Sequence, residues 1–131
     1  MERRVTLEKI VCYQDGSAGA TAWEFQIFGV VLAPATAQRG PNSRTLLDIP
    51  ARNYDDSKGE TVLQMAFTVP ADVSRLQITG KGPGVFGTSV SESVSLGSAK
   101  TLEVRIQAKN PKDGDFLFVF RVEQQYPAAG K

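Results

Sequence analysis

The stretch FLFVFRVE, residues 116–123, shows the pattern that decides the fold. Phe116, Phe118 and Phe120 occupy every second position, and Val122 continues the series. Successive side chains of a β-strand point to opposite faces of the sheet, so this period of two predicts a strand with one face on a core. No long stretch carries the period of a helix. The same alternation recurs in LQMAFTV and LEVRI, at residues 63–69 and 102–106.

The sequence predicts eight strands separated by turns rich in Gly, Pro, Asn and Asp. Short strands divided by such turns are typical of an all-β protein. We therefore expect a single domain over residues 1–131, an antiparallel β-sandwich with Greek-key connections. Within the second strand the apolar positions change parity at Gly29, which predicts a bulge or bend there. The expected strands are 4–13, 22–33, 44–49, 60–69, 75–79, 85–95, 100–108 and 116–125.

Composition excludes several classes of function. The chain has 131 residues, with 15 Lys and Arg against 14 Asp and Glu, a net charge of +1. A non-specific nucleic-acid binder needs a cationic surplus, so nucleic acid is not an expected partner. There is no histidine, which removes the commonest general base and zinc ligand. The single cysteine, Cys12, excludes an internal disulfide and is expected to be a small buried side chain. We therefore expect that the protein is not an enzyme.

The sequence shows neither a signal peptide nor a membrane-spanning segment. A signal peptide needs an uninterrupted apolar run of about 7–15 residues, and Glu8 and Lys9 interrupt the first apolar stretch. The run FQIFGVVLA, residues 25–33, is far shorter than the ~20 residues that span a bilayer. We expect a soluble protein made in the cytosol, with export by a route without a cleaved signal left open.

Five of the seven aspartates are expected at one end of the sandwich. If consecutive strands run antiparallel, the connections 14–21, 50–59, 80–84 and 109–115 all lie at the same end. Calcium takes carboxylate and carbonyl oxygens from loops, so such an acidic rim is a candidate calcium site. The candidate metal ligands are Asp15, Asp55, Asp56, Asp113 and Asp115.

This arrangement, acidic connections at one end of eight strands, resembles the loop tips of C2 domains. The resemblance implies a sandwich that binds calcium and then lipid headgroups. The alternative is ordinary turn chemistry, because Asp caps its own backbone and Gly supplies positive φ. Cations on the same rim could also neutralise the carboxylates without a metal: Arg52, Lys58, Lys81, Lys109 and Lys112.

Two further features leave alternatives open. Tyr54 lies within RNYDD, residues 52–56, where an aromatic ring could contact a partner or fold back over the end of the core. The segment TSVSESVSL, residues 88–96, places serine on one face and aliphatic residues on the other. That pattern suits a pore-lining hairpin, or a half-exposed strand at a sheet edge in which Glu92 discourages further pairing.

The sequence therefore favours a non-enzymatic binding or assembly module that acts through loop tips or a strand edge. One alternative is a calcium-dependent C2-like domain that binds a membrane or a glycan. Another is a subunit of a secreted, pore-forming or viral assembly. A protein partner or a second copy of the chain is the expected partner, and calcium is the one cofactor that the sequence suggests.

Overall fold

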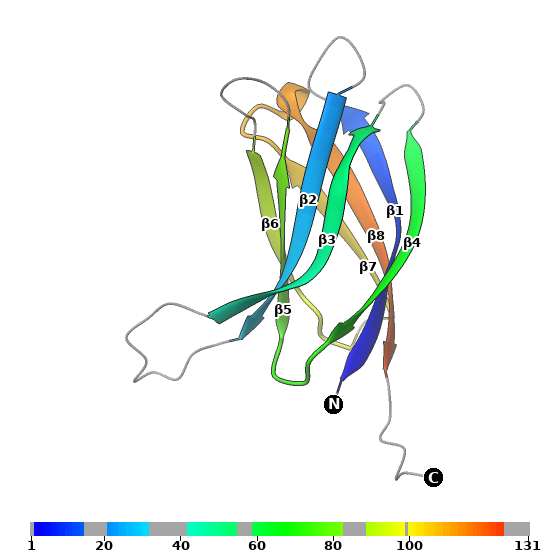
Figure 1. The fold of residues 1–131 in the computed structure, drawn as a ribbon, viewed down its shortest axis with the longest axis vertical. Coiled ribbons are helices and arrows are strands. Elements are labelled where there is room, and N and C mark those ends of the chain that lie inside the picture. The colour runs from blue at the N-terminus through cyan, green and yellow to red at the C-terminus, as the bar shows by residue number, and fades with distance from the viewer. Residues whose placement is uncertain are drawn as a thin grey trace.

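The computed structural model of the chain is built almost entirely of strands (Figure 1). It describes residues 2–14, 21–31, 42–54, 59–82, 89–98 and 100–124. A short 3-10 helix, η1 (Pro111–Asp113), precedes the last strand. No helix among these residues is long and apolar enough to cross a membrane. The strands are β1 (Arg3–Gln14), β2 (Thr21–Val31), β3 (Asn42–Tyr54), β4 (Glu60–Val69), β5 (Arg75–Lys81), β6 (Ser89–Ser95), β7 (Thr101–Gln107) and β8 (Asp115–Gln124).

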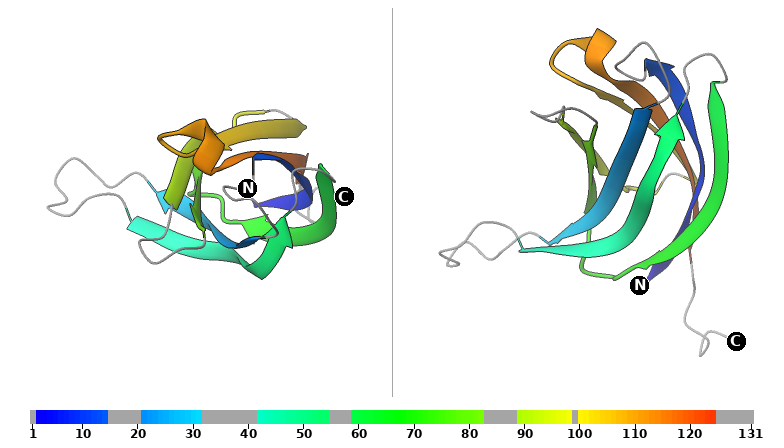
Figure 2. Two further views of the ribbon diagram at one scale, coloured as in Figure 1. Left: turned by 90° about the horizontal axis from the view of Figure 1, so that it is seen from above. Right: turned by 45° about the horizontal axis from the view of Figure 1, so that its top comes forward.

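The strands form two four-stranded antiparallel sheets that pack face to face (Figure 2). Sheet A has the order β4-β1-β8-β7, and sheet B has the order β3-β2-β5-β6. The prediction of an eight-stranded antiparallel sandwich is confirmed. Strands adjacent in a sheet are often distant in sequence. The sequence alone therefore does not show which side chains are neighbours, because that depends on the strand order.

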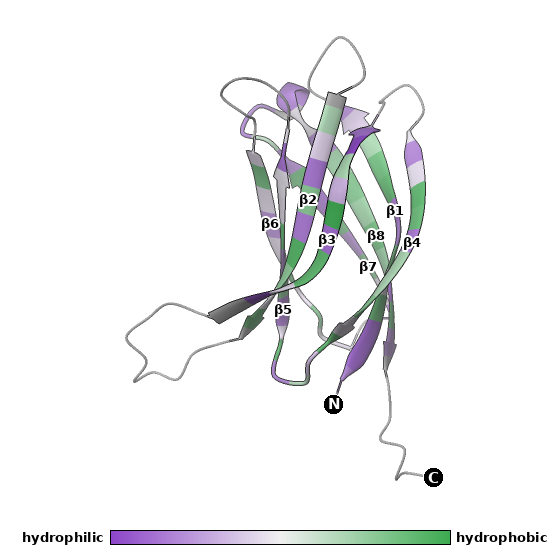
Figure 3. Ribbon diagram, in the orientation of Figure 1, coloured by the Kyte–Doolittle hydropathy of each residue, from purple (hydrophilic) through white to green (hydrophobic). Residues whose placement is uncertain are grey.

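Aromatic side chains from both sheets fill the core between them. Phe116, Phe118 and Phe120 of β8 are fully buried, as their alternation predicts. The ring of Phe25 on β2 meets Phe116 and Phe118 edge to face, with centroids 5.2 and 4.9 Å apart. Coloured by hydropathy, the strands alternate between apolar and polar positions along their length (Figure 3). Burial of these rings supplies the main driving force for pairing the two sheets.

The predicted parity change at Gly29 is wrong. Trp23, Phe25, Ile27 and Gly29 are all buried, so β2 keeps one face on the core throughout this stretch. The irregularity lies instead in the partner strand β3, whose register shifts by one residue between the pairs of Ile27 and Phe28. A Cβ atom at position 29 would lie 3.0 Å from the side chains of Leu46 and Val73, so glycine makes room for the neighbouring chains.

Strand β3 is longer than predicted, because it continues past Pro50 to Tyr54. Proline does not stop it because β3 is an edge strand, and a register shift accommodates residues 50 and 51. Trp23 pairs with Arg52 beyond this point. The predicted strand residues 32–33, 85–88 and 125 lie outside the described part of the chain.

Strand β6 is an edge strand of sheet B, as the second alternative for its sequence predicts. Val90 and Leu96 are buried, whereas the four serines at 89, 91, 93 and 95 are exposed. Glu92 has the same parity as Val90 yet is exposed. A charge on the inward face of an edge strand opposes the addition of a further strand.

Gly80 provides a test of core packing. A Cβ atom there would lie 2.5 Å from the ring of Phe25 and 2.8 Å from Val90. We expect Gly80→Ala to lower the free energy of unfolding by about 1–3 kcal/mol, because the core must shift to admit the methyl group. Urea denaturation measures the change, and Ser95→Ala, on the exposed face of β6, is the matched control. Unchanged stability of Gly80→Ala would contradict this packing.

Candidate functional site

The strand directions confirm that the four predicted connections start and finish at one end of the sandwich. Strands β1, β3, β5 and β7 end there, and η1 lies at the same end, which Figure 1 draws at the top. We call this the upper end. Two of the five candidate calcium ligands can be placed, Asp113 in η1 and Asp115 at the start of β8. Asp15, Asp55 and Asp56 lie outside the described residues.

Asp115 is held by an ion pair within sheet A. Its two carboxylate oxygens accept hydrogen bonds from the guanidinium of Arg105, at 2.6 and 2.7 Å. The amide of Gln107 donates a third bond at 3.3 Å. The side chain of Asp115 is only 7% exposed, and the hydrogen bonds from Arg105 lower the pKa of its carboxyl. Arg105 also lies over the ring of Tyr13, 4.2 Å from its centroid.

The neighbouring residues have structural roles as well. The backbone N–H of Asp113 donates to the carbonyl of Asn110 at 2.8 Å, which closes a turn. A Cβ atom at Gly114 would lie 2.8 Å from the indole of Trp23, and one at Gly82 would lie 2.7 Å from the same ring. The Asp-Gly-Asp sequence therefore serves the turn, the packing of Trp23 and the pair with Arg105.

The calcium site stays a prediction, because only two of its five candidate ligands are placed. Among the described residues, no group of three or more His, Cys, Asp or Glu side chains is placed to hold a metal ion. Three of the five proposed ligands are not among those residues. Asp113 is exposed, whereas Asp115 already has both carboxylate oxygens engaged.

Tyr54 lies in the core rather than at the surface. Its ring meets Phe25 and Phe116 edge to face, with centroids 5.5 and 5.9 Å apart. Its hydroxyl is buried and has no hydrogen-bond partner among the described residues. Burial raises the pKa of Tyr54 to about 12. Of the two alternatives drawn from the sequence, the ring thus folds back over the core. In this conformation a partner could not reach it. Cys12 is also buried, as expected.

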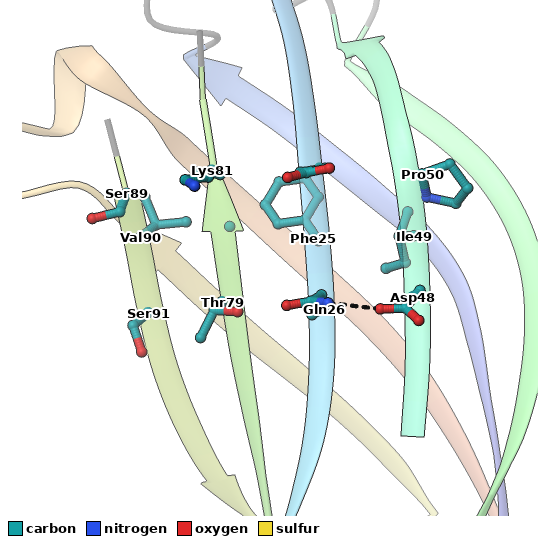
Figure 4. A pocket seen from close by; sticks show the side chains of 12 residues that line it. Phe25, Gln26, Asp48, Ile49, Pro50, Thr79, Lys81, Ser89, Val90 and Ser91 are labelled. Atoms are coloured by element: carbon teal, nitrogen blue, oxygen red, sulfur yellow. Dashed lines mark hydrogen bonds between the residues drawn. The ribbon is translucent and has the colours of Figure 1, made fainter. Parts of the chain in front are cut away.

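A groove that the sequence analysis missed lies on the outer face of sheet B (Figure 4). Its volume is about 600 Å³, and it crosses all four strands near the upper end. Side chains that point away from the core form its polar lining, and the sheet itself forms its floor. The lining comprises Glu24, Phe25, Gln26, Asp48, Ile49, Pro50, Thr79, Gly80, Lys81, Ser89, Val90 and Ser91.

The strand register arranges the polar lining in two rows across the sheet. The first row runs from β3 to β6 through Asp48, Gln26, Thr79 and Ser91. The amide of Gln26 donates to Asp48 Oδ1 at 2.8 Å, the bond drawn in Figure 4. The second row runs from β2 to β6 through Glu24, Lys81 and Ser89. Two carboxylates thus lie toward β3, and one ammonium with several hydroxyls lies toward β6.

The charges of the groove differ from those on the opposite face of the molecule. On the outer face of sheet A, the carboxylates of Glu60 and Glu8 pair with Lys9 and Arg121 at 2.6 and 3.2 Å. In the groove no ion pair within 4.0 Å joins Glu24, Asp48 or Lys81 to another described residue. Within the described part of the chain, only Asp48 among these three groups is engaged, through its hydrogen bond from Gln26.

The groove escaped the sequence analysis because its residues come from four separate segments. Alternating polar positions in 24–26, 48–50, 79–81 and 89–91 were visible, but only the order β3-β2-β5-β6 brings them together. The signal that the sequence did contain was the alternation of polar residues in each of these four segments.

Comparison with known proteins supports the fold and leaves the function open. No protein-family model and no curated protein matches the chain. A solved structure described as a C2 domain is similar, with a TM-score of 0.50 and 11% identity over 95% of this chain and 99% of that one. A second comes from work on how CC2D1B coordinates ESCRT-III activity during the mitotic reformation of the nuclear envelope. It has a TM-score of 0.58 and 10% identity, over 96% of this chain and 55% of that one. The chain therefore has a C2-like fold.

The pair between Asp115 and Arg105 predicts a pH-dependent contribution to stability. Because Arg105 lowers the folded pKa of Asp115 below its ordinary value, the pair stabilises the fold above about pH 4 and is lost as the pH falls through the folded pKa. We expect Asp115→Asn to cost about 1–2 kcal/mol at pH 7, since Arg105 is half exposed. The cost should shrink below pH 4. Urea denaturation between pH 2 and 8 tests this, with Asp113→Asn as control, and a cost independent of pH would contradict it.

The buried hydroxyl of Tyr54 gives a second prediction. Removing a buried polar group that lacks a partner also removes its desolvation penalty. We expect Tyr54→Phe to raise the free energy of unfolding by about 1 kcal/mol, whereas Tyr13→Phe, which keeps its ring under Arg105, should have no effect. Thermal and urea denaturation measure both variants. A clear loss of stability in Tyr54→Phe would show that the hydroxyl is bonded.

Proposed function

We propose that this chain is a non-enzymatic binding module of C2-like fold, and that the groove on sheet B is its binding surface. The groove carries the proposal because it joins a concave surface to charged groups that have no ion-pair partner within the described residues. A concavity with a few convergent polar groups is the usual form of a ligand site. The rigid sandwich beneath holds these groups in a fixed arrangement.

The composition of the groove favours binding over catalysis. Its lining contains no histidine and no cysteine, and one of its two carboxylates is engaged by the amide of Gln26. The groove crosses an open sheet face, where Glu24, Gln26, Asp48 and Lys81 are all exposed. Catalysis by a carboxylate usually needs a shielded site in which its pKa is shifted, and an open polar face favours recognition instead.

A bulky substitution tests whether the groove is the binding surface. We expect Ser91→Trp to fill the β6 side of the groove and to weaken binding at least tenfold, because the indole occupies the volume of the ligand. Ser95→Trp, on the same face of the same strand but outside the groove, is the matched control. Binding is measured by screening peptide arrays, glycan arrays and liposomes with the wild-type chain, followed by titration of each positive probe. If Ser91→Trp leaves every titration unchanged, the groove is not the site.

A second candidate function is calcium-dependent binding of a membrane or glycan at the upper end. It is favoured by the strand directions, which bring the ends of β1 and β3 to the end where Asp113 lies. A cation that binds only the folded chain raises its melting temperature. We expect millimolar calcium to raise the thermal midpoint of the wild type and to have less effect on the variant carrying Asp55→Asn and Asp113→Asn. An unchanged wild-type midpoint would exclude this candidate.

Assembly with a second copy or with another protein, including a secreted, pore-forming or viral assembly, is the third candidate. Tyr13 and Val62 on the outer face of sheet A are its exposed large apolar side chains among the described residues. Light scattering over a range of concentrations distinguishes a monomer from a closed oligomer, because closed symmetry gives discrete masses.

A further inference from the structure

We propose that the groove binds a basic, extended segment of a partner protein, with lysine or arginine side chains directed at Glu24 and Asp48. This inference rests on the proposed function, and it names the chemistry that the same site recognises. Three properties of the groove carry it: the sign of its charge, the spacing of its charged groups, and its dimensions.

The charge of the groove is negative. Among the described residues that line it, Glu24 and Asp48 contribute two carboxylates and Lys81 contributes one cation. The hydrogen bond from Gln26 fixes Asp48 through Oδ1, and no described residue bonds to its second oxygen. A guanidinium or ammonium group of a ligand can therefore take that oxygen in a charge-assisted hydrogen bond.

Lys81 does not neutralise Asp48, because the two residues lie on strands separated by β2. Asp48 belongs to β3 and Lys81 to β5, so at least two strand spacings, or about 10 Å, separate their backbones. This separation is close to the screening length at physiological ionic strength. Glu24 lies opposite Lys81 in the register, and no ion pair joins the two within 4.0 Å. Asp48 is therefore the carboxylate of the groove that keeps most of its attraction for a cation.

The dimensions of the groove suit a short extended peptide. Four strands span about 14 Å from β3 to β6, and an extended chain covers about 3.3 Å per residue, so roughly four residues fit across the sheet. Thr79, Ser89 and Ser91 offer hydroxyls that both donate and accept hydrogen bonds, which suits the backbone of a peptide. A polyanionic headgroup would meet two carboxylates and one ammonium, so an anionic membrane surface is disfavoured.

The test is fluorescence anisotropy of the full chain with a labelled hexa-arginine peptide at low and at physiological salt. We expect Glu24→Gln and Asp48→Asn each to weaken binding about threefold, because exposed charge pairs contribute modestly. We expect Lys81→Gln to leave binding unchanged or to tighten it, since it removes a repulsive cation. Glu123→Gln, on the outer face of sheet A, removes one carboxylate elsewhere and is the matched control for net charge.

The outcomes separate this inference from the proposed function. Binding of hexa-arginine that responds to Asp48→Asn and to Ser91→Trp, but not to Glu123→Gln, supports both. Failure of hexa-arginine to bind overturns the basic-peptide inference. The inference is also overturned if Glu123→Gln weakens hexa-arginine binding as much as the groove variants do. It is overturned as well if hexa-glutamate or phosphatidylserine vesicles bind more tightly than hexa-arginine and Lys81→Gln weakens that binding. If one of those other probes still loses affinity in Ser91→Trp, the groove remains the binding surface and only its ligand class is wrong.

Discussion

The structure depends on the packing of β8 against β2 across the sandwich. The three phenylalanines of β8 are fully buried, and the rings of Phe116 and Phe118 meet Phe25 with centroids 5.2 and 4.9 Å apart. Because β8 is a central strand of sheet A and β2 is a central strand of sheet B, this contact joins the middles of both sheets. The outer strands add to a core whose position these rings have set. The outward faces of the same strands are then free to differ in chemistry.

The two outer faces do differ. On sheet A opposite charges pair with each other, as in Lys9 with Glu60 and Arg105 with Asp115. On the outer face of sheet B the amide of Gln26 bonds to Asp48 and the guanidinium of Arg75 bonds to Ser93, and no ion pair joins Glu24, Asp48 or Lys81 to another described residue. A face whose charges are mutually satisfied gains little from a charged ligand, whereas a face with unpaired charges gains more. This contrast supports the proposal that sheet B carries the binding surface.

Strand identity and core residues could be predicted from the sequence, because alternation is local. Phe116, Phe118 and Phe120 needed only their own spacing. The predictions failed where a neighbouring strand decides the outcome. Gly29 seemed to mark a change of face because Phe28 and Val30 are apolar, but the partner strand absorbs the irregularity. The groove could not be predicted from the sequence for the same reason, since only the strand order of the sheet places Asp48 and Ser91 in one row.

Trp23 has a consequence for how the upper end responds as a unit. A Cβ atom would lie within 3 Å of its indole at Gly82, next to Lys81 of the groove, and at Gly114, next to the buried Asp115. One rigid ring therefore acts as a spacer between two chain segments that are 32 positions apart in sequence. A side chain added at either glycine would have to displace the ring, so the rim of the groove and the start of β8 are both packed around a single side chain.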